Sequence, residues 1–147
     1  MSLETRQWVV NHPHAHFFNK APNHADILNE NKTQTNLIEM IVNLLNKNHI
    51  IYFTAINSDH HDDSSKGLHS HHNGYAFDCW PMRTDKPEDY FDVDSEGFLK
   101  FLHDASTHMY YYQIGLTPDC HTKAAIAVSG NNCFEDDGAS HIHIGVV

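Results

Sequence analysis

The clearest helical pattern in the chain lies in residues 33–48. Apolar side chains there recur at the three- and four-residue spacing that places them on one face of a helix. These positions are Leu37, Ile38, Ile41, Leu44 and Leu45. Thr33 or Thr35 is placed to cap the N-terminus, and Lys47 lies where the helix dipole favours a positive charge. We expect this helix to belong to the core and to carry no chemistry.

A second amphipathic helix is expected to follow Asp94-Ser95-Glu96, a segment with the composition of a helix cap, and to reach about His108. Its apolar positions are Phe98, Leu99, Phe101 and Leu102. Residues 123–128 are apolar enough for a third, short helix, which the Ser-Gly-Asn-Asn segment at residues 129–132 would end.

Four segments have the patterns of β-strands. Residues 50–56 and 110–116 are runs of β-branched, aromatic and other apolar side chains, and residues 75–80 are rich in aromatic ones. Residues 140–147 alternate polar and apolar side chains, which is typical of a strand with one buried face. The buried face of this last strand would carry Ile142, Ile144 and Val146.

The remaining segments lack a long periodic pattern. Pro13 and Pro22 interrupt residues 5–30, for which we expect a short strand or a turn-rich arm. Residues 57–67 form a polar loop that would line a cleft or face solvent, and residues 134–138 form an acidic loop. The order of elements indicates an α+β fold, with a small, mainly antiparallel sheet flanked by helices in a single domain over residues 1–147.

Composition excludes two classes of interaction. A formal net charge of −10 argues against nucleic acid as a partner, because neutralising phosphates requires clustered Lys and Arg. No apolar run reaches the length of a membrane span, and the stretch after Met1 is too short for a secretory signal. We therefore expect synthesis in the cytoplasm without membrane insertion. The oligomeric state is left open by the sequence.

The cysteines favour structural rather than redox or metal-binding roles. Cys79, Cys120 and Cys133 are odd in number and form no Cys-x-x-Cys pair. Reduced, buried side chains are therefore expected.

The residues best suited to bind a metal ion are His71 and Asp78. Imidazole nitrogen and carboxylate oxygen are both good zinc ligands. Asn73-Gly74 between them is a strong turn dipeptide, which would let His71 fold back towards the following strand. Asp78 lies on that strand and would point away from the face that packs into the core.

A second pair of imidazoles lies near the C-terminus. His141 and His143 are two residues apart on the expected last strand, so they would share its solvent-facing side. One can bind a metal ion while the other faces a substrate. Together with His71 and Asp78, this gives a metal site on the face of the sheet, with three protein ligands and one open position.

Other histidine clusters are interpreted more conservatively, because fifteen histidines in 147 residues make chance neighbours common. His12, His14 and His16 alternate and would share one strand face. However, Pro13 interrupts the strand and no carboxylate completes a ligand set, so a solvated arm is the preferred interpretation.

The pattern His-x-x-Gly-x-Ala-x-Asp resembles that of the M15 family of zinc peptidases, a group related to the zinc-binding domain of hedgehog proteins. It is formed by His71, Gly74, Ala76 and Asp78, and the closing His-x-His matches the same family. The resemblance implies that His71, Asp78 and His143 bind Zn²⁺. It also implies that His141 either supports the metal ligands or acts on the transition state, and that Asp137 is the general base. The family usually has Glu at the position of Asp137, and many members have Ser at that of His69.

The resemblance implies zinc-dependent hydrolysis of peptide bonds in peptidoglycan stem peptides, by an endopeptidase or a D,D-carboxypeptidase. A phage or prophage lysis enzyme would reach the cell wall after release, and a virion-associated enzyme is the other setting. Arg83 is a candidate for binding a substrate carboxylate, because a guanidinium can form two parallel hydrogen bonds to it.

Two rival hypotheses come from other functional classes. One is a non-catalytic metal-binding module or phage structural module of the same fold, since one fold supports many functions. The other is a structural protein whose histidines bind no metal. Bound stoichiometric metal would exclude the second rival, and loss of hydrolysis on replacing Asp137 would argue against the first.

Overall fold

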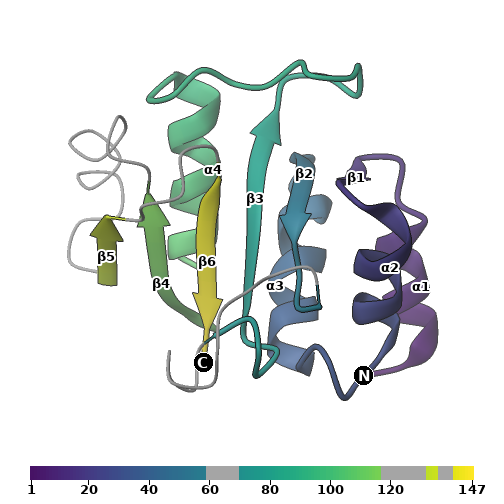
Figure 1. The fold of residues 1–147 in the computed structure, drawn as a ribbon. Helices are drawn as coiled ribbons and strands as arrows, with labels where there is room; N and C mark the ends of the chain where they lie inside the picture. The colour runs from purple at the N-terminus through teal and green to yellow at the C-terminus, as the bar shows by residue number, and fades with distance from the viewer. Residues whose placement is uncertain (59–69, 117–131, 136–140) are drawn as a thin grey trace.

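A computed structural model describes residues 1–58, 70–116, 132–135 and 141–147, with residues 132–135 described by their backbone alone. Within these residues the chain forms one six-stranded sheet in the order β1-β2-β3-β6-β4-β5 (Figure 1). The strands are β1 (Ala15–Phe17), β2 (Ile50–Ala55), β3 (Ala76–Met82), β4 (Tyr111–Leu116), β5 (Asn132–Glu135) and β6 (Ile142–Val146). The two outermost pairs are parallel and the three inner pairs are antiparallel. The predicted α+β fold with a mainly antiparallel sheet is confirmed.

The described helices pack on one face and at one edge of the sheet. They are α1 (Leu3–Val10), α2 (Lys20–Leu28), α3 (Thr35–Asn46) and α4 (Glu96–Ser106). Helix α3 packs against β6, and α4 packs against β3 and β4. Both lie behind the sheet in Figure 1, while α1 and α2 lie at the edge formed by β1. In the described part of the chain, no helix has the length and apolar character needed to cross a membrane.

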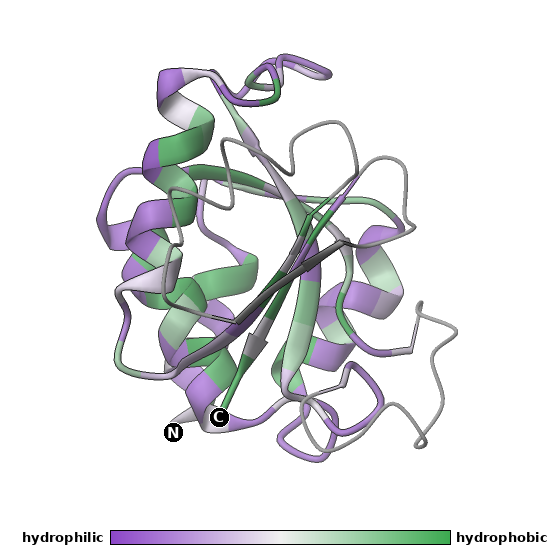
Figure 2. Cartoon of the chain, turned by 90° about the vertical axis from the view of Figure 1, so that its left-hand side faces the viewer, coloured by the Kyte–Doolittle hydropathy of each residue, from purple (hydrophilic) through white to green (hydrophobic). Residues whose placement is uncertain are grey.

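The core lies between the sheet and α3 and α4, where apolar residues gather in Figure 2. Strand β6 contributes the predicted alternate positions, which are fully buried, and β3 contributes Phe77 and Cys79. The buried residues of α3 are Leu37, Ile38, Met40, Ile41, Leu44 and Leu45. Burying one such side chain stabilises the fold by roughly 1.5–3 kcal/mol. This apolar layer fixes which side of β3 and β6 faces outward.

The expected turn-rich arm in residues 5–30 is wrong in large part, because α1 and α2 lie there. The buried face of α1 is short and includes the charged Arg6, so it shows no apolar periodicity. Helix α2 contains Pro22 in its first turn, where a missing backbone N–H costs little. The short strand that was also expected is β1.

The predicted capping of α3 by a threonine is also wrong. The N-cap residue is Gln34, whose side chain makes no capping hydrogen bond. Thr33 is instead fully buried, where its hydroxyl bonds the Arg6 guanidinium at 2.6 Å. Arg6 also donates to the carbonyl oxygens of Ile27 and Thr33, at 2.8 and 2.9 Å. This cation therefore ties α1 to the chain between α2 and α3.

The other predicted elements agree more closely with the structure. The cap of α4 is confirmed, since Ser95 Oγ accepts a hydrogen bond from Phe98 N–H. The backbone of residues 132–135 forms β5. The acidic loop expected over residues 134–138 is therefore wrong for its first two residues. The helix expected in residues 123–128 lies outside the described residues.

A buried carboxylate joins the C-terminal ends of α3 and α4. Asp104 Oδ2 lies 2.6 Å from His49 Nε2 and 3.1 Å from Lys100 Nζ. Burial lowers the pKa of His49 despite the neighbouring Asp104, so His49 is neutral at pH 7 and donates its N–H. Burial acts to raise the pKa of Asp104, but hydrogen bonds from His49 and Lys100 outweigh it and lower the pKa below 3.8.

Replacing Asp104 by Asn should reduce the free energy of unfolding by about 2 kcal/mol at pH 7, the size of a charge-assisted hydrogen bond. A carboxyl group whose pKa is lower in the folded protein than in the unfolded chain stabilises the fold at pH values above its unfolded pKa. That stabilisation is lost as the pH falls through the pKa of the folded protein. The difference between wild type and Asp104→Asn should therefore shrink as the pH falls below about 4. Urea unfolding at several pH values measures this difference. A difference that stays constant with pH would contradict the assignment, and the exposed Asp92→Asn serves as the control.

Candidate metal centre

Strand pairing brings Asp78 and His143 together. The two residues lie directly opposite each other in the antiparallel register of β3 and β6. Side chains at such paired positions point to the same face of a sheet. Their chain neighbours on both strands are in the core, so Asp78 and His143 point to the opposite face. The predicted shared face is confirmed for this pair.

A tight turn before β3 delivers His71 to the same place. Gly74 N–H donates to the His71 carbonyl oxygen at 2.9 Å, and Tyr75 N–H donates to that of Ser70 at 3.1 Å. Gly74 has a φ of +79°, a conformation that only glycine adopts readily. A Cβ atom at this position would lie 2.7 Å from the Lys32 carbonyl oxygen. The glycine of the motif is therefore required by backbone conformation and by space.

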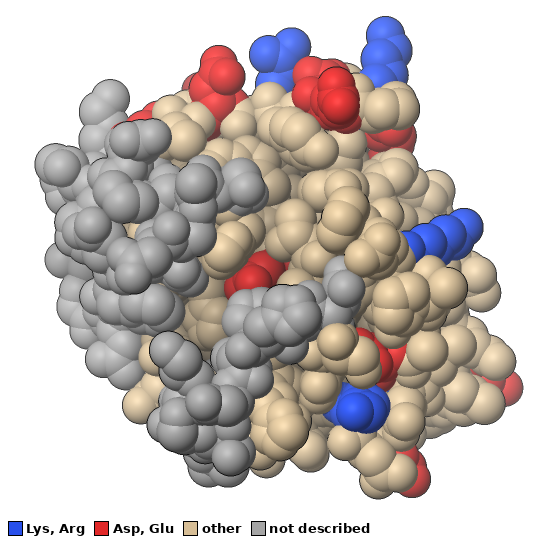
Figure 3. All heavy atoms as spheres, viewed as in Figure 1, with Lys and Arg blue, Asp and Glu red and all other residues tan. Residues whose placement is uncertain are grey.

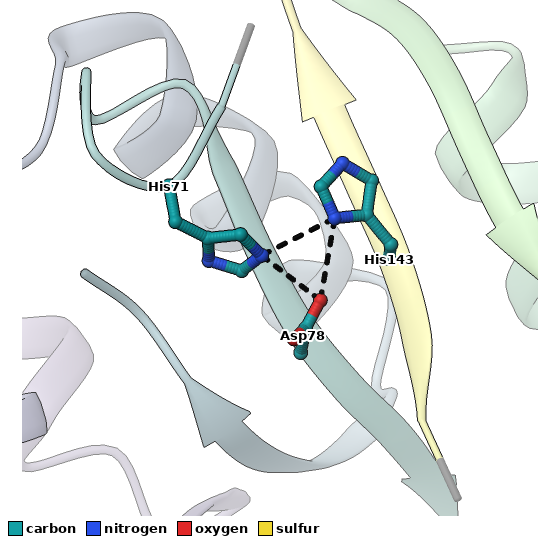
Figure 4. Close-up of side chains that lie close together, drawn as sticks. All are labelled: His71, Asp78 and His143. Carbon is teal, nitrogen blue, oxygen red and sulfur yellow. Dashed lines mark hydrogen bonds and ion pairs between the residues drawn. The ribbon is translucent and has the colours of Figure 1, made fainter. Parts of the chain in front are cut away.

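Three ligand atoms converge in this arrangement (Figure 4). His71 Nε2 lies 3.0 Å from Asp78 Oδ1 and 3.2 Å from His143 Nδ1. His143 Nδ1 lies 3.3 Å from Asp78 Oδ1. Tetrahedral zinc, with ligand bonds of about 2.0–2.2 Å, holds its ligand atoms about 3.3 Å apart. These side chains thus already have the spacing that a tetrahedral ion requires.

The tautomer of His71 supports binding of a cation. Its Nδ1 lies 2.9 Å from the Ile56 carbonyl oxygen, which can only accept a hydrogen bond. Nδ1 therefore carries the hydrogen, and Nε2 presents a lone pair to Asp78. Two groups that can only accept a hydrogen bond then face each other at 3.0 Å. A metal ion or a shared proton resolves this contact. His71 is fully buried, and a hydrogen bond from the second ring nitrogen to a backbone carbonyl is usual for a metal-binding histidine.

Helix α2 fixes the segment that holds His71. Asn23 Oδ1 accepts a hydrogen bond from Ile56 N–H at 3.1 Å. The Asp26 carboxylate accepts bonds from Asn57 N–H and Ser58 N–H at 3.3 and 2.7 Å. The element that the sequence did not predict therefore supports the orientation of a predicted ligand.

His141 lies beside the three ligands, as the sequence predicted. Its Nε2 lies 3.6 Å from Asp78 Oδ2, whereas His71 Nε2 lies 3.0 Å from Asp78 Oδ1. The side chain is 21% exposed, compared with 3% for Asp78, so it lies between the buried ligands and solvent. His141 is thus placed to meet a molecule that approaches the site.

Two other predicted residues are not brought to this cluster by the described structure. Asp137 lies outside the described residues. Arg83 follows the end of β3, opposite to the end that the His71 turn precedes, and its Nε lies 3.3 Å from Asp89 Oδ1. Arg83 is five positions after Asp78 along the chain, which is roughly 16 Å in extended backbone.

A second cluster of histidines and an aspartate was not predicted from the sequence. Asp85 Oδ1 lies 3.0 Å from His14 Nδ1 and 2.8 Å from His16 Nε2. The expectation that no carboxylate accompanies these histidines is therefore wrong, because the loop after β3 supplies one. Burial acts to raise the pKa of Asp85, but hydrogen bonds from His16 and His14 outweigh it and lower the pKa below 3.8. No local sequence signal links residues 69 to 71 positions apart.

Cys79 is excluded as a ligand. Its side chain is fully buried in the core, on the opposite face of β3 from Asp78. Burial, aided by the neighbouring Asp78 charge, raises the pKa of the thiol well above 9.0. The thiol therefore stays protonated, and the expected reduced structural role is confirmed for this cysteine.

The cluster has the composition of a metal site with an open position. Two neutral imidazoles and one carboxylate leave a divalent ion with a net positive charge and room for a further ligand. Figure 3 shows acidic atoms near the centre of this face, with no coloured Lys or Arg atoms directly beside them. In comparisons with known proteins, neither a protein-family model nor a curated protein matches the chain.

Replacing His71 by Ala should abolish tight binding of one equivalent of metal, because it removes the buried ligand. The adjacent His72→Ala should keep that equivalent, because His72 is exposed and joins no ligand cluster among the residues that the structure describes. Zinc titration calorimetry on both variants measures the stoichiometry. Equal binding by the two variants would contradict the assignment.

Replacing Gly74 by Ala should reduce the free energy of unfolding by at least about 1–2 kcal/mol, the cost of a left-handed conformation for a residue with a Cβ atom. It should also weaken zinc binding, because the turn that carries His71 must move away from Lys32. Urea unfolding and zinc titration measure the two effects. Wild-type values for both would show that the turn does not position the ligand.

Proposed function

We propose that the protein is a zinc-dependent peptidase that cleaves peptidoglycan stem peptides. The observation that carries this proposal is the convergence of His71 Nε2, Asp78 Oδ1 and His143 Nδ1 at the spacing of tetrahedral ligands. A site of two histidines and one carboxylate is characteristic of catalytic zinc, which keeps a position open for water or substrate. Zinc in such a site supplies a Lewis acid and lowers the pKa of a bound water.

Two further residues, His141 and Asp137, would supply the remaining functions of a hydrolase. His141 lies on the solvent side of Asp78 and would stabilise the negative charge that develops on the scissile carbonyl oxygen. Asp137, four residues earlier in the chain, would accept the proton of the attacking water and donate it to the leaving amine. The buried His71 and the nearly buried Asp78 exclude solvent from the inner side of the site.

The substrate class follows from the sequence resemblance to the M15 peptidases. The motif residues His71, Gly74, Ala76 and Asp78 occupy the turn and strand that build the site, and His71, Gly74 and Asp78 each have a physical reason to be there. Cleavage of a D-amino-acid-containing stem peptide, in a phage lysis enzyme or a virion, is the corresponding proposal.

A non-catalytic metal-binding module is the second candidate function. The observation that favours it is Asp137, which is one methylene shorter than the Glu usual in the family. The same ligand geometry would then stabilise a binding domain or a phage structural domain.

Mass spectrometry of purified peptidoglycan fragments tests the peptidase. Incubation with the zinc-loaded protein should shorten the stem peptide, and a chelator should prevent the change. The mass of the product identifies the bond. Fragments that stay intact under all conditions would contradict peptidoglycan cleavage and favour the binding module.

Two variants separate catalysis from metal binding in the same assay. Asp137→Ala should lower the rate by at least about 100-fold, the usual contribution of a general base, and should retain one zinc equivalent. The neighbouring Asp136→Ala is the matched control and should keep the wild-type rate. Equal rates for these two variants would remove Asp137 from the mechanism.

A further inference from the structure

A glutamine on the neighbouring strand contacts the outer nitrogen of a metal ligand. Gln113 lies on β4, which pairs with β6. Its amide Nε2 lies 3.3 Å from His143 Nε2, the ring nitrogen that points away from His71 and Asp78. This residue was not selected from the sequence, because an isolated glutamine on a strand carries no local signal.

The backbone is shaped to allow this contact. Gln113 is paired with Gly145, and the register of β4 and β6 is irregular between Tyr111 and Gln113. A Cβ atom on Gly145 would lie 2.9 Å from Gln113 Cγ and 3.2 Å from its amide nitrogen. Because Gly145 has no side chain, the side chain of Gln113 has the space to reach His143.

The two histidine ligands differ in the group that holds their outer nitrogen. His71 is held by a backbone carbonyl, which can only accept and so fixes one tautomer. His143 is held by an amide, which has both a donor and an acceptor end. A neutral imidazole carries one N–H, so the end of the amide that faces the ring decides which nitrogen has the lone pair.

In the present arrangement the amide nitrogen faces the ring. It donates to His143 Nε2, so the ring hydrogen lies on Nδ1, which faces His71 Nε2 at 3.2 Å and Asp78 Oδ1 at 3.3 Å. This hydrogen then points towards the two acceptors and occupies the place of a metal ion. A half-turn of the amide places Gln113 Oε1 against the ring instead, where it accepts a hydrogen bond from Nε2–H and leaves the Nδ1 lone pair for a metal ion.

We propose that Gln113 is a positioning residue that sets the tautomer of His143, and that its amide reverses when the site takes up zinc. The inference rests on the metal-binding part of the proposed function and not on hydrolysis. His71 Nε2 and Asp78 can bind zinc in either orientation of the Gln113 amide. His143 Nδ1 can bind zinc only after the amide has turned.

Three replacements test this role by their zinc dissociation constants, measured in competition with a chromophoric chelator. Gln113→Leu removes both hydrogen-bonding ends and should weaken zinc binding by about 10–100-fold, as loss of a ligand's supporting hydrogen bond does. Gln113→Glu keeps an acceptor and should stay within about 10-fold of wild type. Gly145→Ala displaces Gln113 and should resemble Gln113→Leu. The exposed Gln7→Leu is the control and should bind as wild type does.

Nitrogen NMR of the His143 ring, assigned with His143→Ala, tests the tautomer itself. The wild-type ring should carry its hydrogen on Nδ1 without zinc and on Nε2 with zinc. Equal weakening by Gln113→Leu and Gln113→Glu would show that the glutamine only fills space, and an unchanged tautomer would exclude the reversal. A wild-type protein that binds no zinc would overturn the metal site and this role together, whereas zinc binding without hydrolysis would overturn only the peptidase.

Discussion

The cross-strand pairing of Asp78 with His143 is the constraint on which the site depends. It joins segments 65 positions apart in the sequence and places a carboxylate oxygen 3.3 Å from an imidazole nitrogen. A slip of one residue by either strand would turn its own ligand candidate into the core and expose the apolar neighbours of that residue. The burial of Phe77, Cys79 and the alternate residues of β6 therefore fixes the chemistry as well as the fold.

The third ligand is held by independent means, and these show how the first half of the chain contributes. Gly74 provides the turn, the Ile56 carbonyl oxygen fixes the ring of His71, and Asn23 fixes Ile56. Helix α2 thus serves the site without contributing a ligand. Such supporting hydrogen bonds orient ligands before an ion arrives, which reduces the cost of assembling the site.

The sequence predicted the parts of this structure that depend on local pattern. The strands β2, β3, β4 and β6 and the helices α3 and α4 follow from periodicity. The cluster of His71, Asp78 and His143 follows from a short motif and the family resemblance that it carries. The parts it missed depend on contacts between distant residues. Helix α1 buries Arg6 against backbone carbonyls, α2 buries Asn23 and Asp26 for polar contacts, and Gln113 acts across a strand pair. Buried polar groups of this kind leave no apolar period to detect.

The central claim is that these three atoms hold one metal ion, and anomalous diffraction at the zinc absorption edge tests it most directly. Crystals grown with one equivalent of zinc should show one principal peak, bounded by His71 Nε2, Asp78 and His143 Nδ1. A principal peak between His14, His16 and Asp85 instead, or density consistent only with hydrogen-bonded side chains at the predicted site, would contradict the claim.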